Sequence, residues 1–417
     1  MRRIEAEALD LAAFIRPGDR VLCGQVSAEP QTLAAALPAA LGAAGPFETF
    51  LGTVTSTSFD AAPAEMRFAG YGAMGRASRL ARRRQLDVWP LHYGALEAGF
   101  ASGRIRADVV LLQLAAGPGG LCATLANDYV LAAARQARCV IAEVSSRAPW
   151  CVGAEIAPGL RIDALVETER EPVSSPATAA GEVERAIAGH VAALVPDGAT
   201  IQIGIGAIPD AILDGFADHR ELGIHSGVFG DRMAELIAGG VFTDARKTVD
   251  RGQAVANVVV GSRRAFDMLD RNDAIRLRPA AHTHAHSVLA RQERMTAINA
   301  AIEVDLSGQI NAETADGAPV GGAGGMCDFI RGARASQGGR AIVALRATDR
   351  TGKVSRIVPR VAAVTVARTD ADTIVTEYGI AELAHRSDAE RARALIGIAA
   401  PQHREMLERS LREGDTR

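Results

Sequence analysis

The chain has 417 residues, of which 48% are hydrophobic and 23% are charged, a composition typical of a globular protein with room for two domains. The net charge of −3 and the 4% content of aromatic residues argue against binding to nucleic acid or to an anionic membrane. The five cysteines lack CxxC spacing, which argues against a disulfide framework or a structural zinc site, and the lack of a signal-peptide or transmembrane stretch predicts a cytoplasmic protein.

One pattern near the N-terminus recurs in the second half of the chain. Both copies contain a Pro/Asp/Gly turn, an apolar strand, a glycine that ends the strand, and a proline where a helix should begin. These features fall at Gly18, residues 21–23, Gly24 and Pro30 in the first copy, and at Gly198, residues 201–203, Gly204 and Pro209 in the second. A repeat of this length predicts two similar α/β domains rather than a solenoid.

The remaining elements fit two open α/β domains with mostly parallel sheets. Apolar runs at residues 107–115, 137–146, 340–348 and 372–379 predict buried strands, and residues 128–137 and 231–240 predict helices. A Pro- and Ser-rich stretch at residues 168–184 places the boundary between domains at residues 1–175 and 176–417. A ligand is expected between the domains, near the carboxyl ends of the strands.

Two glycine-rich stretches are candidates for ligand binding. The first, "GIGAIPDAIL", is a strand-to-helix turn that includes Gly204, Ile205, Gly206, Ala207 and Ile208. Its backbone N–H groups could face a phosphate, a carbonyl or an oxyanion. A turn that needs glycine only for its conformation would have the same sequence pattern. It is neither a Walker A loop nor a dinucleotide fingerprint, because no Gly-Lys-Ser/Thr follows and Pro209 holds the place of the third glycine.

The second stretch carries glycines at four of five positions, namely Gly321, Gly322, Gly324 and Gly325. It leads into an apolar helical segment, residues 327–335, rather than into a run of serines and charges. We therefore favour close approach of its backbone to a ligand over a surface linker.

Histidines suggest a metal only weakly. The sequence "HTHAH" places His282, His284 and His286 on one side of an expected extended segment, where alternate imidazoles can bind zinc. No carboxylate or cysteine with ligand spacing completes the set, so a polar loop is favoured and no metal is expected. His225, at the end of a short strand, is expected to be a hydrogen-bonded structural residue rather than a catalytic one.

Carboxylates at strand ends are candidates for acid–base chemistry. Glu303 and Asp305 fall on the same side of an extended run, and Glu377 and Tyr378 end another apolar strand. Paired or edge carboxylates can transfer protons, although a strand with solvated acidic residues looks similar.

Together these motifs resemble the acetyl-CoA hydrolase/4-hydroxybutyrate CoA-transferase family. The matching motifs are "DGATIQIGIGAIPDAIL", "LGIHSGVFGD", "INAAIEVDLSGQINAE", "GGAGGMCDFIRGARASQGGRAIVAL" and "VTEYGIAEL", in the family order, and the resemblance is strongest over residues 197–405. It implies two domains of the CoA-transferase fold, an acyl-CoA substrate without a metal, a small carboxylate as possible acceptor, and a homodimer. It also implies that the two glycine stretches line the CoA thioester, with Arg340 where relatives usually have a lysine near CoA.

In relatives the strand after the first glycine stretch ends in His-Ser/Thr-Glu, and this glutamate attacks the thioester and becomes a glutamyl-CoA thioester. Here the same place reads His225-Ser226-Gly227. The resemblance therefore implies that the usual glutamyl-CoA intermediate cannot form at Gly227. Ser226 has no visible histidine–acid partnership beyond the adjacent His225, and no nearby glutamate replaces the missing one by a simple shift of register.

Three hypotheses follow. The favoured one is an enzyme that acts on acyl-CoA without a glutamyl intermediate, such as a hydrolase whose water is activated by Glu303 or Glu377, or a transferase to another acceptor. The second is a conventional CoA-transferase with a carboxylate supplied from elsewhere. The third is an acyl-CoA-binding protein without catalytic activity.

Overall fold

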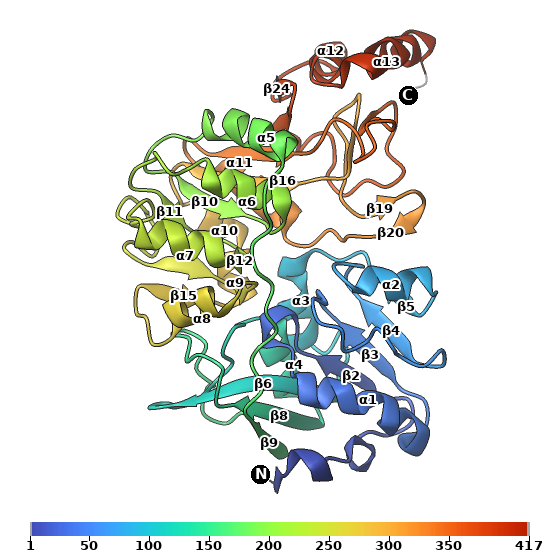
Figure 1. Ribbon diagram of the computed structural model, residues 1–417, viewed down its shortest axis with the longest axis vertical. Helices are drawn as coiled ribbons and strands as arrows, with labels where there is room; N and C mark the ends of the chain where they lie inside the picture. The colour runs from blue at the N-terminus through green and yellow to red at the C-terminus, as the bar shows by residue number, and fades with distance from the viewer. Residues whose placement is uncertain (1, 415–417) are drawn as a thin grey trace.

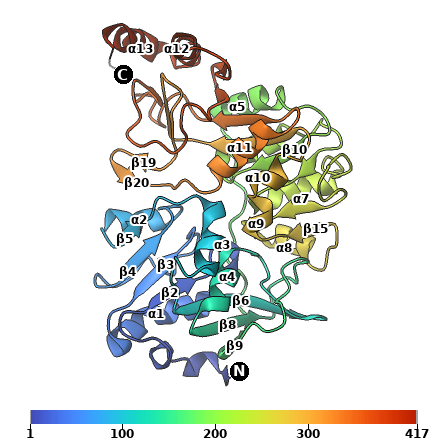
Figure 2. The same cartoon turned by 180° about the vertical axis from the view of Figure 1, so that it is seen from behind.

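Two α/β halves, each built on one large sheet, make up the protein, and the computed structural model describes residues 2–414 (Figure 1). The N-terminal half occupies the lower part of Figure 1 and the C-terminal half the upper part. A single connecting segment between β9 (Ala164–Thr168) and α5 (Glu182–Ala192) joins them. Seen from behind, α12 (Asp388–Gly397) and α13 (Pro401–Glu413) again lie at the end of the molecule opposite the N-terminus (Figure 2).

The N-terminal sheet has nine strands in the order β1–β9–β8–β6–β2–β3–β4–β5, with β7 paired to β6. The pairs along this order are parallel, and only the pairing of β7 with β6 is antiparallel. The further strands are β1 (Arg2–Ile4), β2 (Arg20–Cys23), β3 (Glu48–Leu51), β4 (Arg67–Gly70), β5 (Leu86–Val88), β6 (Val109–Gly117), β7 (Gly120–Cys122) and β8 (Cys139–Ser145). The helices are α1 (Gln31–Ala44), α2 (Ala77–Arg82), α3 (Tyr93–Ala101) and α4 (Tyr129–Gln136).

Helices cover both faces of this sheet, which explains why its strands are apolar at nearly every position. In β2, Val21 and Cys23 pack in the cluster that contains α1 and α2, whereas Leu22 packs in the cluster that contains α3 and α4. A strand buried on both sides cannot alternate apolar and polar residues, and this is the pattern that the sequence shows.

The C-terminal sheet has six strands in the order β11–β10–β16–β21–β23–β24, and only the last pair is antiparallel. These strands are β10 (Thr200–Ile203), β11 (Gly223–Ile224), β16 (Met295–Ala300), β21 (Arg340–Ala344), β23 (Thr373–Thr376) and β24 (Gly379–Glu382). One face packs against α5 and α6 (Ala207–Asp214), and the other packs against α10 (His286–Leu289) and α11 (Met326–Ala335). The prediction of two open, mostly parallel α/β sheets is therefore confirmed.

Smaller sheets extend the C-terminal half. They pair β12 (Val228–Phe229) with β14 (Val258–Val259), β13 (Ala254–Ala256) with β15 (Ile275–Leu277), β17 (Glu303–Asp305) with β18 (Ile310–Asn311) and β22 (Ile357–Val358), and β19 (Thr314–Ala315) with β20 (Ala318–Pro319). Helices α7 (Asp231–Ala238), α8 (Arg263–Leu269) and α9 (Ala280–Thr283) lie among them. Within the part of the chain that the structure describes, no helix is both long and apolar enough to cross a bilayer.

The internal repeat corresponds to equivalent structural positions. A strand follows the turn in each copy, β2 in the first and β10 in the second, and both strands lie within their sheets rather than at an edge. Gly18 and Gly198 both adopt positive φ angles, +79° and +73°, which only glycine adopts readily.

The expected extended conformation of the "HTHAH" segment is wrong. Residues 280–283 form α9 and residues 286–289 form α10, so the three histidines do not alternate along a strand. Pro279 precedes α9 with extended backbone angles, and proline at such a position is compatible with a helix start.

Candidate functional site

A cavity of about 170 Å³ lies at the junction between the two halves, where the carboxyl ends of β2, β3 and β4 face those of β10 and β16. The N-terminal half contributes Gln25, Val26, Thr53, Tyr71, Met74 and Tyr93; the C-terminal half contributes Gln202 to Ile205, Gly227, Val228, Val258, Val260, His284, Asn299, Gly324 to Met326, and Phe329. A ligand site was expected between the domains at strand ends, and the cavity occupies this position.

Gln25 organises the N-terminal wall of the cavity. Its side-chain oxygen accepts hydrogen bonds from the Tyr71 hydroxyl at 2.8 Å and from the Thr53 backbone N–H at 3.0 Å. Its amide nitrogen donates to Asp128 at 2.7 Å. Burial raises the pKa of Asp128 to about 6, because the carboxylate is removed from water.

Tyr93 connects this network to the other half. Its hydroxyl donates to the Asn257 side-chain oxygen at 2.6 Å, and its backbone N–H donates to the Gly324 carbonyl at 2.8 Å. Tyr93 starts α3, so the beginning of this helix is bonded directly to the second glycine stretch. These bonds fix the two walls of the cavity relative to each other.

Gln202 and Asn299 form the polar part of the C-terminal wall. They lie on the neighbouring strands β10 and β16, where Gln202 pairs in register with Ala297, and their side-chain amides bond reciprocally at 3.2 and 3.1 Å. Neutral amides thus line this part of the cavity, where burial of a charged side chain would be unfavourable because the charge would lose its hydration.

The first glycine stretch only partly reaches the cavity. Gly204 and Ile205 line it, whereas Gly206, Ala207 and Ile208 turn into α6 beside it. Gly206 is the N-terminal cap of α6 and has a φ of +115°, a conformation that favours glycine. Ile205 is 43% exposed, which is unusual for a large apolar side chain at a loop apex.

The second glycine stretch has two distinct roles. Gly322 packs against the backbone of Gly72, where an added Cβ would lie 2.9 Å from the Gly72 Cα, and the Gly321 carbonyl accepts a hydrogen bond from the Ala73 N–H at 2.7 Å. Gly324 and Gly325 instead line the cavity. Close contact between the halves therefore explains Gly322, whereas a Cβ on Gly321 would clash with the Ala312 carbonyl oxygen of its own half. Only the last two glycines face a possible ligand.

Gly227 lies on the cavity wall between the buried Ser226 and β12. Its carbonyl accepts a hydrogen bond from the Val258 N–H at 3.1 Å, and its φ lies outside the left-handed region. A Cβ added here would lie 3.1 Å from Nε2 of His284 and 3.3 Å from Phe329. The equivalence of this position with the glutamate of relatives stays a prediction.

His284 was not predicted as a cavity residue. Its imidazole is 6% exposed and lies between Tyr93 and Phe329, with a ring-centroid distance of 4.7 Å to each. Burial lowers the pKa of His284 to about 3, so the ring is neutral near pH 7. In the sequence it stands among three histidines of a polar segment, and no spacing connects it with Gly227.

The residues before Gly227 have structural roles. His225 is fully buried, with Nε2 at 3.2 Å from the Thr283 carbonyl and Nδ1 at 3.3 Å from the Gln292 amide nitrogen. The Ser226 hydroxyl donates to the Ile203 carbonyl at 3.1 Å and does not line the cavity. The expected structural role of His225 agrees with these contacts, and Ser226 is poorly placed as a nucleophile.

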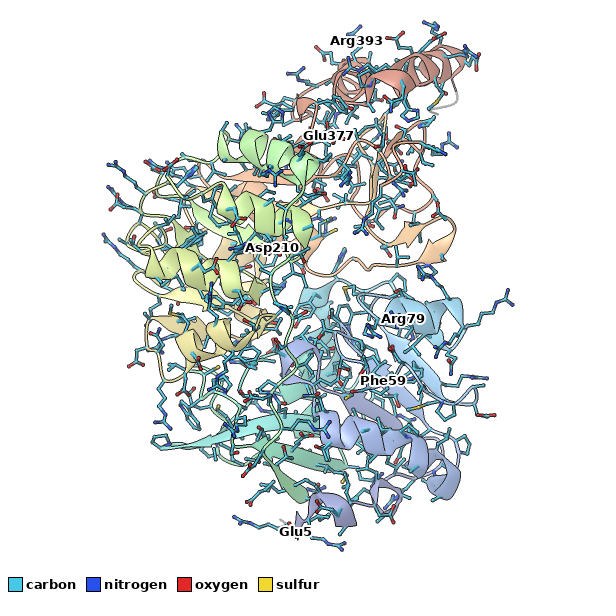
Figure 3. The ribbon with its side chains drawn as sticks, viewed as in Figure 1. Glu5, Phe59, Arg79, Asp210, Glu377 and Arg393 are labelled. Atoms are coloured by element: carbon cyan, nitrogen blue, oxygen red, sulfur yellow. The ribbon has the colours of Figure 1, made fainter. Side chains whose placement is uncertain are left out.

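The carboxylates named as possible bases do not line the cavity. Glu303 is ion-paired with Arg356 at 3.2 Å and accepts a bond from Asn311 at 3.1 Å. Glu377 accepts a hydrogen bond from the Ala347 N–H at 2.8 Å, and Figure 3 shows it farther from the junction between the halves than Asp210. Their expected catalytic role has no geometric support at this cavity.

Arg340 also lies away from the cavity. It is the first residue of β21 and pairs in register with Thr296 near the start of β16, so it lies at the amino-terminal ends of the strands, whereas the cavity lies at their carboxyl ends. Its guanidinium forms an ion pair with Glu382 at 3.1 Å. This placement argues against a contact between Arg340 and a thioester bound in the cavity.

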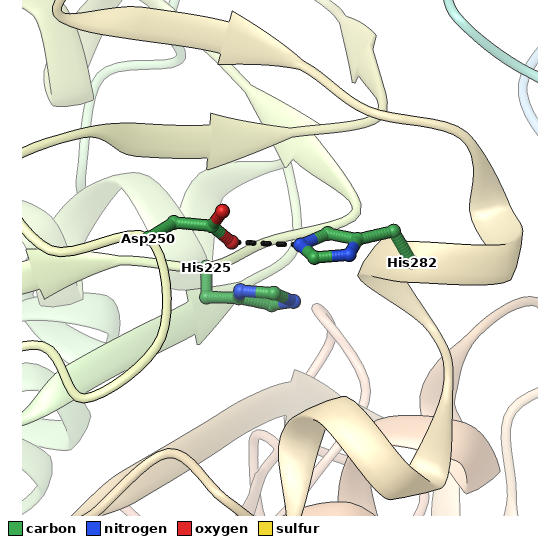
Figure 4. A group of neighbouring side chains, drawn as sticks. All are labelled: His225, Asp250 and His282. Atoms are coloured by element: carbon green, nitrogen blue, oxygen red, sulfur yellow. Dashed lines mark hydrogen bonds and ion pairs between the residues drawn. The ribbon is translucent and has the colours of Figure 1, made fainter.

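Among residues 2–414, the side chains of His225, Asp250 and His282 lie close enough together to offer three ligand atoms to one cation (Figure 4). Asp250 already bonds to Nε2 of His282 at 2.7 Å and to Arg278 at 3.2 Å, and these partners hold the pKa of its carboxyl well below the usual range. Both ring nitrogens of His225 also have partners. A metal ion would have to displace these contacts, so we assign no metal to this group.

The three histidines of the "HTHAH" segment face different surroundings. His282 bonds to Asp250, His284 lines the cavity, and His286 is exposed at the start of α10. They cannot bind one metal ion together. The interpretation of this segment as something other than a zinc site is consistent with this arrangement.

Comparison with known proteins identifies relatives over most of the chain. A family model described as the acetyl-CoA hydrolase/transferase C-terminal domain matches residues 261–411. The 4-hydroxybutyrate coenzyme A transferase of Clostridium kluyveri is 38% identical over 326 residues, which are 77% of this chain and 76% of that protein. An acetyl-CoA hydrolase of Eremothecium gossypii is 31% identical over 267 residues, which are 59% of this chain and 49% of that protein.

Solved structures show the same architecture over the whole chain. RipA from Yersinia pestis superposes with a TM-score of 0.92 at 30% identity, covering 100% of this chain and 98% of RipA. A 4-hydroxybutyrate CoA-transferase from Porphyromonas gingivalis superposes with a TM-score of 0.81 at 28% identity, covering 99% of this chain and 98% of that protein. With its fold, its motifs and these relatives in agreement, the chain belongs to the acetyl-CoA hydrolase/4-hydroxybutyrate CoA-transferase family.

Proposed function

We propose that the protein cleaves an acyl-CoA thioester in the cavity between its halves without forming a glutamyl-CoA intermediate, and that water is the acceptor of the acyl group. Relatives named CoA transferase and acetyl-CoA hydrolase support CoA thioesters as the substrate class. The predicted equivalence of Gly227 with the family glutamate supports a route without covalent attachment at that position, because glycine has no carboxylate.

The lining of the cavity is the observation that carries this proposal. Among its described lining residues there is no Asp, Glu, Lys or Arg, and the polar groups are neutral amides, hydroxyls and His284. A glutamyl intermediate needs a carboxylate here, and an incoming carboxylate acceptor would have no cation to offset the loss of its hydration. Water meets neither obstacle. The same lining favours a short, uncharged acyl group.

Backbone N–H groups near the cavity offer a way to stabilise the oxyanion. Gly325 and Gly206 are the N-terminal caps of α11 and α6, and both stretches approach the cavity through Gly324, Gly325, Gly204 and Ile205. Helix N-termini carry a partial positive charge, so a thioester oxygen directed at them gains stabilisation as negative charge develops. Bulky side chains at these glycines would block that approach.

CoA transfer to a small carboxylate is the second candidate, because the relative from Clostridium kluyveri, which is 38% identical, is named a CoA transferase. It requires a carboxylate nucleophile that reaches the cavity from elsewhere. Glu303 and Glu377 are bonded to Arg356 and to the Ala347 N–H, respectively, and neither lines the cavity.

One assay separates these functions. Purified protein is mixed with acetyl-CoA or butyryl-CoA, with and without an excess of acetate, propionate or butyrate, and both free CoA thiol and new acyl-CoA are measured by chromatography. Hydrolysis predicts thiol release that does not depend on the added carboxylate, and no new acyl-CoA.

Formation of a new acyl-CoA matching the added carboxylate would reject hydrolysis in favour of transfer. Tight binding of acyl-CoA with neither product would instead indicate an acyl-CoA-binding protein. A binding measurement by calorimetry, made on the same preparation, distinguishes this outcome from a protein that has lost its ligand site.

A further inference from the structure

The His284 ring occupies the space into which a side chain at position 227 would project. A Cβ on Gly227 would lie 3.1 Å from Nε2 and 3.3 Å from Cε1 of this ring. A Cβ on Gly325 would lie 2.6 Å from the same Nε2, closer than real Cβ atoms approach. Both glycines thus leave room for the imidazole at the cavity wall, and a small molecule beside Gly227 lies within hydrogen-bond reach of Nε2.

Aromatic neighbours fix the orientation of the ring. The Tyr93 ring lies at an interplanar angle of 37° to it and the Phe329 ring at 56°, both with centroids 4.7 Å away. Tyr93 is itself held by its hydrogen bond to Asn257. A ring packed on two sides cannot turn Nε2 away from the cavity without moving one of the walls.

The contacts of Thr283 identify the proton on the ring. Its hydroxyl oxygen lies 2.8 Å from Nδ1 of His284 and 3.3 Å from the Pro279 carbonyl oxygen. A proton is available for both contacts only if Nδ1–H donates to the hydroxyl and the hydroxyl donates to the carbonyl. Nε2 then carries a free lone pair, and among the described residues no hydrogen bond to it is formed.

We propose that His284 is the general base of thioester hydrolysis and that Gly227 makes room for the attacking water. This inference rests on the proposed function, which it deepens. Nε2 accepts a proton from water while the water oxygen bonds to the thioester carbon. The tetrahedral oxyanion then collapses, the carbon–sulfur bond breaks, and the proton on Nε2 passes to the CoA sulfur, which gives a carboxylic acid and the CoA thiol.

Other candidate bases are already occupied. Both nitrogens of His225 have partners, and Glu303 and Glu377 lie outside the cavity lining. His284 supplies the only imidazole among the described residues that line the cavity, and its Nε2 has no hydrogen-bond partner there. Thr283 acts as a positioning residue, because it holds the ring in the tautomer that exposes the Nε2 lone pair to the cavity.

The test replaces His284 by glutamine, which keeps a polar group near Nε2 but cannot accept a proton from water. Acetyl-CoA hydrolysis is followed by thiol release, and binding is followed by calorimetry with a non-hydrolysable thioether analogue of acetyl-CoA. Loss of a general base predicts a fall in kcat of about a hundredfold or more, with analogue affinity unchanged within a few-fold. The matched control is His286→Gln, two residues along and exposed, which should hydrolyse at the wild-type rate.

Each contrary result has a distinct meaning. Wild-type turnover that survives His284→Gln would reject His284 as the base but leave the proposed hydrolysis intact. An acylated His284 peptide in quenched reactions would show a nucleophile instead of a base and would also overturn the inference. If the wild-type protein binds the analogue but releases no thiol, the proposed function fails and the role of His284 fails with it.

Discussion

Replacing Gly227 by glutamate tests whether crowding by His284 decides what position 227 can hold. The backbone should accept the change, because φ at Gly227 lies outside the left-handed region, so the strain of about 1–2 kcal/mol expected there does not apply. The obstacle is steric, because the new Cβ would approach His284 and Phe329 at 3.1–3.3 Å. Overpacking of this kind costs about 1–3 kcal/mol.

A smaller residue at 284 should relieve most of that cost. We expect Gly227→Glu to lower the free energy of unfolding by about 1–3 kcal/mol, which a folded domain tolerates. Adding Gly227→Glu to a His284→Ala background should lower the free energy of unfolding by clearly less, because the close contact with the imidazole of His284 is gone. The difference between the two costs is the coupling between the positions.

Urea unfolding followed by circular dichroism measures all four proteins of this cycle. Gly42→Glu is the matched control, because Gly42 lies in α1 with nothing within 4 Å of an added Cβ, and it should not destabilise the fold. The reasoning is refuted if Gly227→Glu costs the same with His284 and with Ala at 284. It is equally refuted if the single substitution has no cost at all.

Two further predictions concern ligand binding and pH. Valine at Gly206 or Gly324, where φ is +115° and +50°, should weaken binding of the thioether analogue in protein that still folds, and unchanged affinity by calorimetry for both variants would contradict this. The pKa of His225 and His284 is about 3 in the folded state, below the unfolded value near 6.5, so unfolding takes up protons and stability falls as pH drops below about 6.5. From pH 7 to pH 5 each histidine accounts for about 2 kcal/mol, so His284→Gln should reduce the acid-induced loss by that amount, and an unaltered pH dependence of the urea midpoint would contradict it.

Much of the fold could be predicted from the sequence because its strands are buried on both faces. The continuous apolar runs around β6, β8, β21 and β23 are typical of parallel strands that are covered by helices on both faces. The internal repeat also predicted that β2 and β10 are equivalent strands. The turn before each strand contains a glycine, Gly18 or Gly198, with a positive φ angle. The helices α9 and α10 were missed because they have only four residues each and carry no periodicity.

The site was predicted only as far as its backbone loops. Gly204, Gly324 and Gly325 line the cavity, whereas Gly322 packs against the backbone of the other half and Gly321 against Ala312 of its own half. Arg340, Glu303 and Glu377 belong to motifs shared with relatives but do not line the cavity, because the first two form ion pairs elsewhere and Glu377 accepts a hydrogen bond from the Ala347 N–H.

His284 lies 57 positions after Gly227 in the chain, and only folding brings the two together. No local sequence pattern predicts such a contact, because the position of the His284 ring depends on the packing of α9 against α3. The hydrogen bonds of Gln25 with Tyr71 and Asp128 could not be predicted for the same reason, since these residues come from separate parts of the chain.

The most direct measurement of the central claim is a search for covalent CoA on the wild-type protein. Protein turning over acetyl-CoA is quenched, treated in parallel with borohydride or hydroxylamine, digested, and examined by peptide mass spectrometry, with a glutamate-dependent CoA-transferase as positive control. Because Gly227 provides no carboxylate, we expect thiol release with no modified glutamate in any peptide. A glutamate reduced by borohydride or converted to a hydroxamate in the wild-type protein would contradict the account.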